Sequence, residues 1–131
     1  MALALIALGE GLLGDQNLKE ARKEFESIQK EYNEKTHPLA IAGALRGLGR
    51  IALQEGDLGG AIFQLEKAAQ FFGQLKRKQE LARTVLYLAQ ALRQKGENKK
   101  ASSKFEEALK AFHSFNAQKD LERALKFLKR S

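Results

Sequence analysis

An all-helical fold built from repeated pairs of helices is predicted by three features of this sequence of 131 residues. Pro38 is its only proline, and Ala, Leu, Glu, Lys, Gln and Arg, which favour helices, dominate its composition. The apolar residues recur every three or four positions, which is the period of a helix. The pair Leu48-Gly49 also has counterparts forty positions away on both sides, Leu8-Gly9 and Leu88-Ala89. Because self-similarity at such a spacing is typical of stacked helical units, we predict a solenoid of three repeats.

The first repeat is predicted to contain two helices. Its first helix carries Leu8 and Leu12 on one face and ends at residues 14–17, where Gly-Asp-Gln-Asn interrupts the pattern. Its second helix covers residues 18–34 and has a one-sided apolar stripe that requires a partner surface. Since the first helix has no N-cap and no preceding turn, we expect the chain to be a piece of a longer array, cut inside a helix.

The second repeat is predicted from its helix boundaries. Thr36 supplies a cap residue and Pro38 suits the first turn of a helix, which extends to about Glu55. Gly56 fits a left-handed C-cap position, and Asp57 can cap the helix that follows. The second repeat is therefore also a helix pair.

The third repeat is predicted to contain helices over about residues 78–95 and 98–115, separated at Gly96. The forty-residue period continues beyond it, because Glu80-Leu81 is echoed by Asp120-Leu121. We therefore expect a seventh helix over residues 117–130, which covers the last exposed apolar face.

The recurring positions resemble the tetratricopeptide repeats, whose first helix carries a large apolar residue, Leu-Gly and another large residue, and whose second helix alternates small and aromatic residues. The matching first-helix positions are Leu5/Leu8-Gly9/Leu12, Leu45/Leu48-Gly49/Ala52 and Val85/Leu88-Ala89/Leu92, and the second-helix positions are Ala21/Phe25/Ile28, Ala61/Leu65/Ala68 and Ala101/Phe105/Ala108. The resemblance covers nearly the whole chain and implies one domain, residues 1–131, folded as a right-handed α-solenoid. Its repeats would cover about residues 1–36, 37–76 and 77–116, and its capping helix about residues 117–130.

The forty-residue period is longer than the usual period of about 34 residues in this family. It is similar to the longer arrays of bacterial regulators and of kinesin-light-chain-like adaptors. The resemblance implies a non-catalytic module that binds proteins or peptides, as the sensing or assembly region of a larger regulatory protein.

The small residues of the repeat have a physical explanation of their own. Gly49 and its counterparts Gly9 and Ala89 are expected where the two helices of a pair approach most closely, opposite small residues such as Ala61 on the second helix. A larger side chain there would push the helices apart.

The resemblance also places the first helices of the repeats along a concave groove. Arg46 and Arg50 lie one turn apart on one helix face, and Gly43 and Gly47 beside them would leave room for ligand atoms. Because guanidinium groups suit carboxylates, we expect an acidic peptide or an acidic partner helix. The alternative is a solvated face whose arginines pair with neighbours such as Glu80. The expected lining residues are Ile6, Glu10, Leu13, Gly43, Arg46, Gly47, Arg50, Arg83, Tyr87, Gln90, Arg93 and Gln94.

The net charge of +7 is unevenly distributed, because residues 1–40 carry −2, residues 41–80 carry +2 and residues 81–131 carry +7. Oppositely charged ends would favour self-association through exposed repeat ends. The basic third repeat also offers an alternative function, nucleic-acid binding, although aromatic residues for base stacking are sparse there. Its lysines are Lys95, Lys99, Lys100, Lys104 and Lys110.

Signatures of enzymes and cofactors are weak. Residues 9–14, Gly-Glu-Gly-Leu-Leu-Gly, match the dinucleotide-binding pattern and leave a nucleotide-binding enzyme fragment as a third hypothesis, but such a site needs strands where this sequence predicts helices. His37 and His113 have no cysteine or second histidine at metal-ligand spacing. Glu106 and Glu107 point about 100° apart on a helix, which disfavours a paired acid and base. We therefore predict no catalysis, no cofactor and no metal.

The sequence contains no cysteine, which fits a reducing compartment. The apolar residues 1–8 lack a positive flank, and Gly9 and Glu10 interrupt them well short of the roughly 18 residues that span a membrane. We therefore expect a cytoplasmic protein without a membrane segment.

Overall fold

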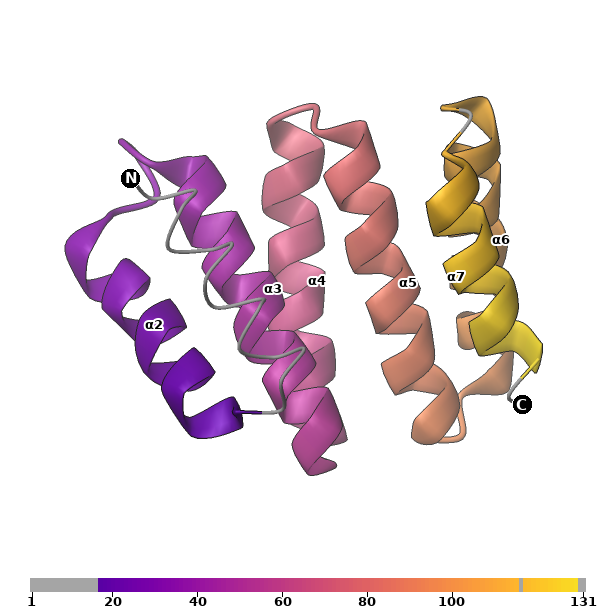
Figure 1. Cartoon of the computed structure of the whole chain (residues 1–131), viewed down its shortest axis with the longest axis horizontal. Helices are drawn as coiled ribbons and strands as arrows, with labels where there is room; N and C mark the ends of the chain where they lie inside the picture. Colours follow the sequence, from indigo (N-terminus) through magenta and orange to yellow (C-terminus); the bar gives the residue numbers. More distant parts are fainter. Residues whose placement is uncertain (1–16, 116, 130–131) are drawn as a thin grey trace.

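The computed structural model describes residues 17–115 and 117–129, together with the side chains of these residues up to 126. The predicted first helix, the expected site residues Ile6, Glu10 and Leu13 and the glycine pattern at residues 9–14 lie outside this part. Every element in the described ranges is a helix, so the all-helical prediction is confirmed there (Figure 1). The helices are α2 (Leu18–Glu31), α3 (Pro38–Glu55), α4 (Leu58–Gln74), α5 (Lys78–Gln94), α6 (Asn98–Ser114) and α7 (Gln118–Lys129).

Most predicted helix boundaries are confirmed together with their causes. Pro38 occupies the first turn of α3, and Gly56 ends α3 in the left-handed conformation with φ 82°. The Asp57 carboxylate caps α4 by accepting a hydrogen bond from the Gly60 amide at 3.1 Å. Gly96 has φ 93° after α5, as expected for a glycine that closes a helix.

Two helix boundaries differ from the prediction, and one turn was not predicted. Helix α2 ends at Glu31, three residues before the expected residue 34. His37, not Thr36, stands at the N-cap of α3 and makes no capping bond. The Thr36 hydroxyl instead donates to the Asn33 side chain at 3.1 Å, because that oxygen already organises the turn by accepting from the amides of residues 35 and 36. The turn after α4 contains Lys76 at φ 57°, a left-handed conformation that no glycine signals in the sequence.

The helices pack in a zigzag. Each described helix contacts the next one along the chain, and the only other contacts between described helices join α3 to α5 and α5 to α7. In Figure 1 the helices therefore follow one another across the molecule in chain order. Helices α3, α5 and α7 lie in one layer, and α4 and α6 lie behind them in a second layer.

The core lies between the two layers and is divided into three clusters along the row of helices. The positions predicted to face inward from the second helix of each repeat are all buried, with at most 3% of their surface exposed. They are Ala21, Phe25, Ile28, Ala61, Leu65, Ala68, Ala101, Phe105 and Ala108. The forty-residue pattern thus identified the buried face of α2, α4 and α6 correctly.

The close approach of α3 and α4 expected at Gly49 is confirmed, but the nearest side chains are Leu65 and Gln64 and not the expected Ala61. A Cβ atom at this position would lie 2.7 Å from the Cγ atom of Leu65 on α4, well inside a normal contact. The side chain that fills this space is Leu65, and glycine lets α3 pack directly against it.

In the described ranges, no helix combines the length and the hydropathy needed to cross a membrane.

Candidate functional site

Polar side chains from α3 and α5 meet on the outer face of the layer that these helices share. On α5, the residues Arg83, Tyr87, Gln90 and Gln94 follow one another at intervals of three or four positions and therefore share one side of the helix. On α3, Arg50 and Gln54 are one turn apart. The contact between α3 and α5 brings these two stripes together.

A hollow of about 260 Å³ lies between the two stripes, lined by Arg50, Leu53, Gln54, Tyr87, Gln90 and Gln94. The guanidinium carbon of Arg50 stands 4.6 Å from the centre of the Tyr87 ring. This cation–π contact orients the arginine side chain along the wall of the hollow. The structure therefore brings together four of the expected lining residues, Arg50, Tyr87, Gln90 and Gln94.

Leu53 and Gln54 also line the hollow, although the sequence argument did not select them. Gln54 lies one helical turn beyond Arg50, so continuing the stripe by four positions would have found it. Leu53 could not be found in this way, because its place depends on how α3 rotates against α5.

Arg46 does not lie on this surface as expected. Only 7% of it is exposed, and its guanidinium group forms an ion pair with Glu80 on α5 and stands 5.1 Å from the Phe72 ring. The alternative interpretation, in which an arginine of α3 pairs with Glu80, is correct for this residue. The expectation of two exposed arginines one turn apart is therefore wrong.

Arg83 is likewise engaged in ion pairs. Its Nε atom donates to Asp120 Oδ1 at 3.1 Å, its Nη2 atom donates to Asp120 Oδ2 at 3.2 Å, and Nη1 donates to Glu80 at 3.1 Å. Gln79 adds a further donor to Asp120 at 3.3 Å. Such two-pronged contacts match the fork of the guanidinium group to the carboxylate. Asp120 is only 6% exposed, so α7 is joined to α5 through a largely desolvated contact.

The residues Arg46, Glu80, Arg83 and Asp120 thus form a continuous ion-pair chain from α3 through α5 to α7. It holds two cations and two anions, so its formal charges cancel. The surface is consequently less basic than the sequence predicted, and among the residues that line the hollow Arg50 carries the positive charge.

The two glycines expected to leave room for a ligand do not do so. Gly43 and Gly47 are both buried. A Cβ atom at Gly47 would lie 2.3 Å from Cζ of Phe25, so the ring from α2 already fills that space. Gly47 is a packing residue between α2 and α3.

Arg93 lies apart from the hollow. Its guanidinium carbon stands 5.2 Å from the centre of the Phe105 ring on α6. Arg93 is three positions beyond Gln90 on α5, but its side chain packs against α6. Arg93 is therefore not among the residues that line the hollow.

The two histidines occupy ordinary positions. The His37 ring packs edge-on against Tyr32 with 4.7 Å between ring centres, and His113 is exposed near the end of α6. Within the described part of the chain, no group of three or more His, Cys, Asp or Glu side chains is placed to hold a metal ion.

Chemically, the hollow presents one guanidinium group, three primary amides and a phenol beside the aliphatic side chain of Leu53. Amides and guanidinium groups donate hydrogen bonds to carboxylates and to backbone carbonyl groups. These six lining residues contain no nucleophile paired with a base, so the arrangement suits non-covalent binding. No protein-family model matches the chain, and no curated protein matches its sequence.

Proposed function

We propose that this chain is a non-catalytic protein-interaction module that binds a segment of a partner protein in the hollow between α3 and α5. The helix pairs α3–α4 and α5–α6 are taken as two tetratricopeptide-like repeats of a right-handed solenoid, and α7 as its cap. The zigzag packing and the regular burial of the second helices support this assignment. The observation that carries the functional proposal is the hollow itself, with Arg50 stacked on Tyr87 and surrounded by glutamines.

The chemistry of the hollow favours an acidic segment in an extended conformation. Its volume of about 260 Å³ is below the roughly 300 to 1,000 Å³ typical of sites for small molecules, so it suits one or two side chains of a peptide. The positive charge of Arg50 favours a carboxylate among them. Gln54, Gln90 and Gln94 can pair with the backbone of the bound segment, since an amide both donates and accepts hydrogen bonds.

The wider setting of the proposal is a cytoplasmic regulatory protein in which this module senses or assembles. The absence of cysteine from all 131 residues supports a reducing compartment. The alternative function, nucleic-acid binding by the lysines of the third repeat, receives less support. Lys100 pairs with Glu97 at 3.7 Å and Lys104 pairs with Glu107 at 3.4 Å. Aromatic side chains on which bases could stack are sparse beside these lysines.

The proposal is tested by selecting binders from a displayed library of random peptides and measuring their affinity by fluorescence anisotropy. Gln94→Glu places a carboxylate in the hollow, whereas Gln74→Glu is its matched control. Both glutamines are exposed and each is the last residue of a helix of 17 residues, so the charge disturbs the helix end equally. Only Gln94 lines the hollow.

We expect the selected peptides to be rich in Asp and Glu. We also expect Gln94→Glu to weaken their binding by about five- to tenfold through like-charge repulsion, while Gln74→Glu leaves it within about twofold. Equal affinities of the two variants, or selected peptides without acidic residues, would contradict the proposal.

A further inference from the structure

The opposite side of α5 carries a second stripe, which has no part in the hollow that Tyr87 lines. Leu81, Val85, Leu88, Leu92 and Lys95 follow one another at intervals of four and three positions and so share one face. At about 100° per residue, this face lies roughly half a turn away from the face of Tyr87 and Gln90. This apolar face of α5 is directed toward the second layer of helices. In that layer α4 and α6 each contact α5 but do not contact one another.

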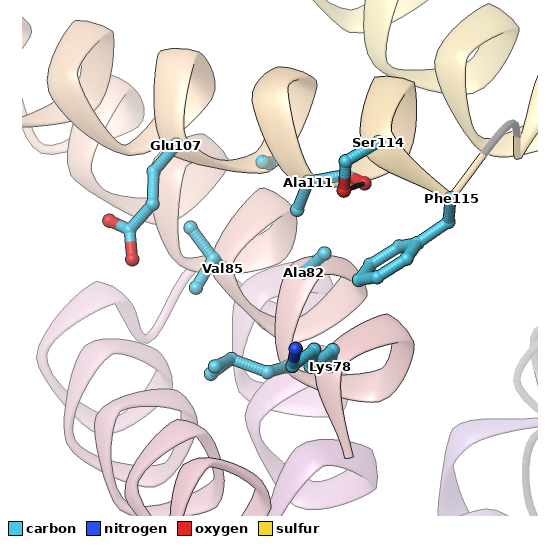
Figure 2. A pocket seen from close by; sticks show the side chains of 9 residues that line it. Lys78, Ala82, Val85, Glu107, Ala111, Ser114 and Phe115 are labelled. Carbon is cyan, nitrogen blue, oxygen red and sulfur yellow. Dashed lines mark hydrogen bonds between the residues drawn. The ribbon is translucent and has the colours of Figure 1, made fainter. Parts of the chain in front are cut away.

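Two hollows lie along this stripe. The larger, of about 630 Å³, lies where α4, α5 and α6 meet and includes Ile62, Leu88, Leu92, Lys100 and Lys104 in its lining. The smaller, of about 270 Å³, lies between the first half of α5 and the second half of α6. Figure 2 shows Ala82 and Val85 in this smaller hollow, with Glu107 and Phe115 at its opposite ends.

The two hollows have no lining residue in common, but we infer from the stripes that they share on α5 and α6 that they are successive parts of one groove. On α5 their lining residues continue the same stripe, from Leu81 and Val85 in the smaller hollow to Leu88 and Leu92 in the larger. On α6 the stripe likewise continues from Lys104 to Glu107, since these residues are three positions apart. From Leu81 to Lys95 the groove follows 14 helical steps, or about 21 Å at 1.5 Å per residue. We call it the α4–α6 groove.

The α4–α6 groove has an aliphatic floor and one basic wall. Val85, Leu88 and Leu92 lie at its bottom and are only 3–5% exposed, and Ile62 and Leu81 add half-buried aliphatic edges. Lys100 and Lys104 stand on the wall that α6 forms, and their side chains are 71% and 38% exposed. The ion pairs that they make with Glu97 and Glu107 are weak at such exposed positions, so both lysines can turn to an incoming carboxylate.

We propose that the α4–α6 groove binds an amphipathic helix of a partner protein, about four turns long. The helix lays its apolar face on Ile62 and Leu81, above the nearly buried Leu88 and Leu92, and directs acidic side chains toward Lys100 and Lys104. A row of apolar residues between two helices is the surface on which such a helix docks. The net charge of +7 on residues 81–131 attracts an acidic partner to this end of the chain.

The same observations favour a protein helix over a nucleic acid. The lining combines four lysines with three glutamates, a mixture that a helix with patterned charges can match and a uniformly anionic phosphate backbone cannot. The floor is aliphatic, whereas single-stranded nucleic acids stack their bases on aromatic side chains. A partner helix satisfies both features with one apolar face and one acidic flank.

The probe is a designed peptide of 15 residues that carries Leu and Ala on one helical face and Glu along one flank. A second peptide replaces each Glu by Lys, and fluorescence anisotropy with the full chain measures both. We expect the Glu peptide to bind at least about tenfold more tightly than the Lys peptide, and the preference to reverse in a Lys100→Glu/Lys104→Glu variant.

Two adjacent serines provide a matched pair of variants. Ser102 and Ser103 are both exposed on α6, but only Ser103 lines the groove. Ser103→Trp should fill the groove and weaken the Glu peptide at least about tenfold, whereas Ser102→Trp should leave its affinity within about twofold. Circular dichroism of each variant checks that the helices are intact.

Equal affinities for the two peptides, or equal effects of the two tryptophans in folded protein, would overturn the proposal. It would also be overturned if a labelled single-stranded oligonucleotide bound more tightly than the Glu peptide and displaced it, because the groove would then be a nucleic-acid site. The proposal about the hollow between α3 and α5 is unaffected by either result, since that hollow lies on the other side of α5.

Discussion

Adding one methyl group at Gly47 tests how closely α2 packs against α3. A Cβ atom at this position would lie 2.3, 2.4 and 2.5 Å from the Cζ, Cε2 and Cε1 atoms of Phe25. Carbon atoms in contact normally stand about 3.5 to 4.0 Å apart, so the ring would have to move by roughly 1 Å or more. Phe25 is completely buried, so moving its ring disturbs the packing of the surrounding core.

The expected change in the free energy of unfolding on Gly47→Ala is the sum of two opposing effects. Alanine stabilises a helix interior by about 1 kcal/mol relative to glycine, and overpacking a core costs about 1 to 3 kcal/mol. Gly47→Ala should therefore lower the free energy of unfolding by up to about 2 kcal/mol. Gly59→Ala is the control, because a Cβ atom at Gly59 on α4 would meet nothing within 4 Å. It should leave stability unchanged or raise it by up to about 1 kcal/mol, so the two variants should differ by about 1 to 3 kcal/mol.

Urea denaturation followed by far-UV circular dichroism measures both variants. A third variant, Phe25→Leu, removes the ring, and in that background Gly47→Ala should cost much less than in the native chain. This coupling in a double-mutant cycle identifies Phe25 as the side chain that the methyl group meets. If Gly47→Ala stabilised the protein as much as Gly59→Ala does, the close packing of α2 on α3 described above would be refuted.

Substitutions at three further positions test other parts of the fold. Ala61→Leu should destabilise the protein by about 1 to 3 kcal/mol in urea denaturation, because Ala61 is fully buried; an unchanged midpoint would reject this packing. Asp57→Ala should cost about 0.5 to 2 kcal/mol in the same assay by removing the cap of α4, and Asp57→Asn should cost less because asparagine also caps helices. Asp120→Asn should cost about 1 to 3 kcal/mol by weakening the contact with Arg83, and hydrogen exchange should show faster opening of α7 than of α3; equal changes in the two helices would argue against this local role.

Much of the fold could be predicted because it depends on short-range signals. The starts and ends of α3 and α4 follow from Pro38, Gly56 and Asp57, whose conformational preferences act within a few residues. The buried face of each second helix follows from apolar spacing, since a helix with one apolar stripe must cover it. The turn at Lys76 was missed because its left-handed conformation depends on how α4 and α5 join and not on a preference of lysine.

The candidate site was predictable only in part, for a related reason. Helical spacing places Tyr87 and Gln90 on one face of α5, and the structure brings both of them to the hollow. The same spacing cannot say that Gly47 meets Phe25 or that Arg46 meets Glu80, because these contacts depend on the offset and rotation between helices. Two of the arginines expected on a basic surface, Arg46 and Arg83, are therefore neutralised in ion pairs with Glu80 and Asp120.

By itself, the sequence determined the helical class, most helix boundaries and the faces that are buried, because each depends on local free energies summed over a few turns. The tertiary structure decided which charges neutralise one another, which glycines are filled by neighbouring side chains, and where hollows remain. The Arg50–Tyr87 hollow and the α4–α6 groove lie on opposite sides of α5 for this reason. Each is a space between helices, and such a space is set by how whole helices pack and not by the preferences of single residues.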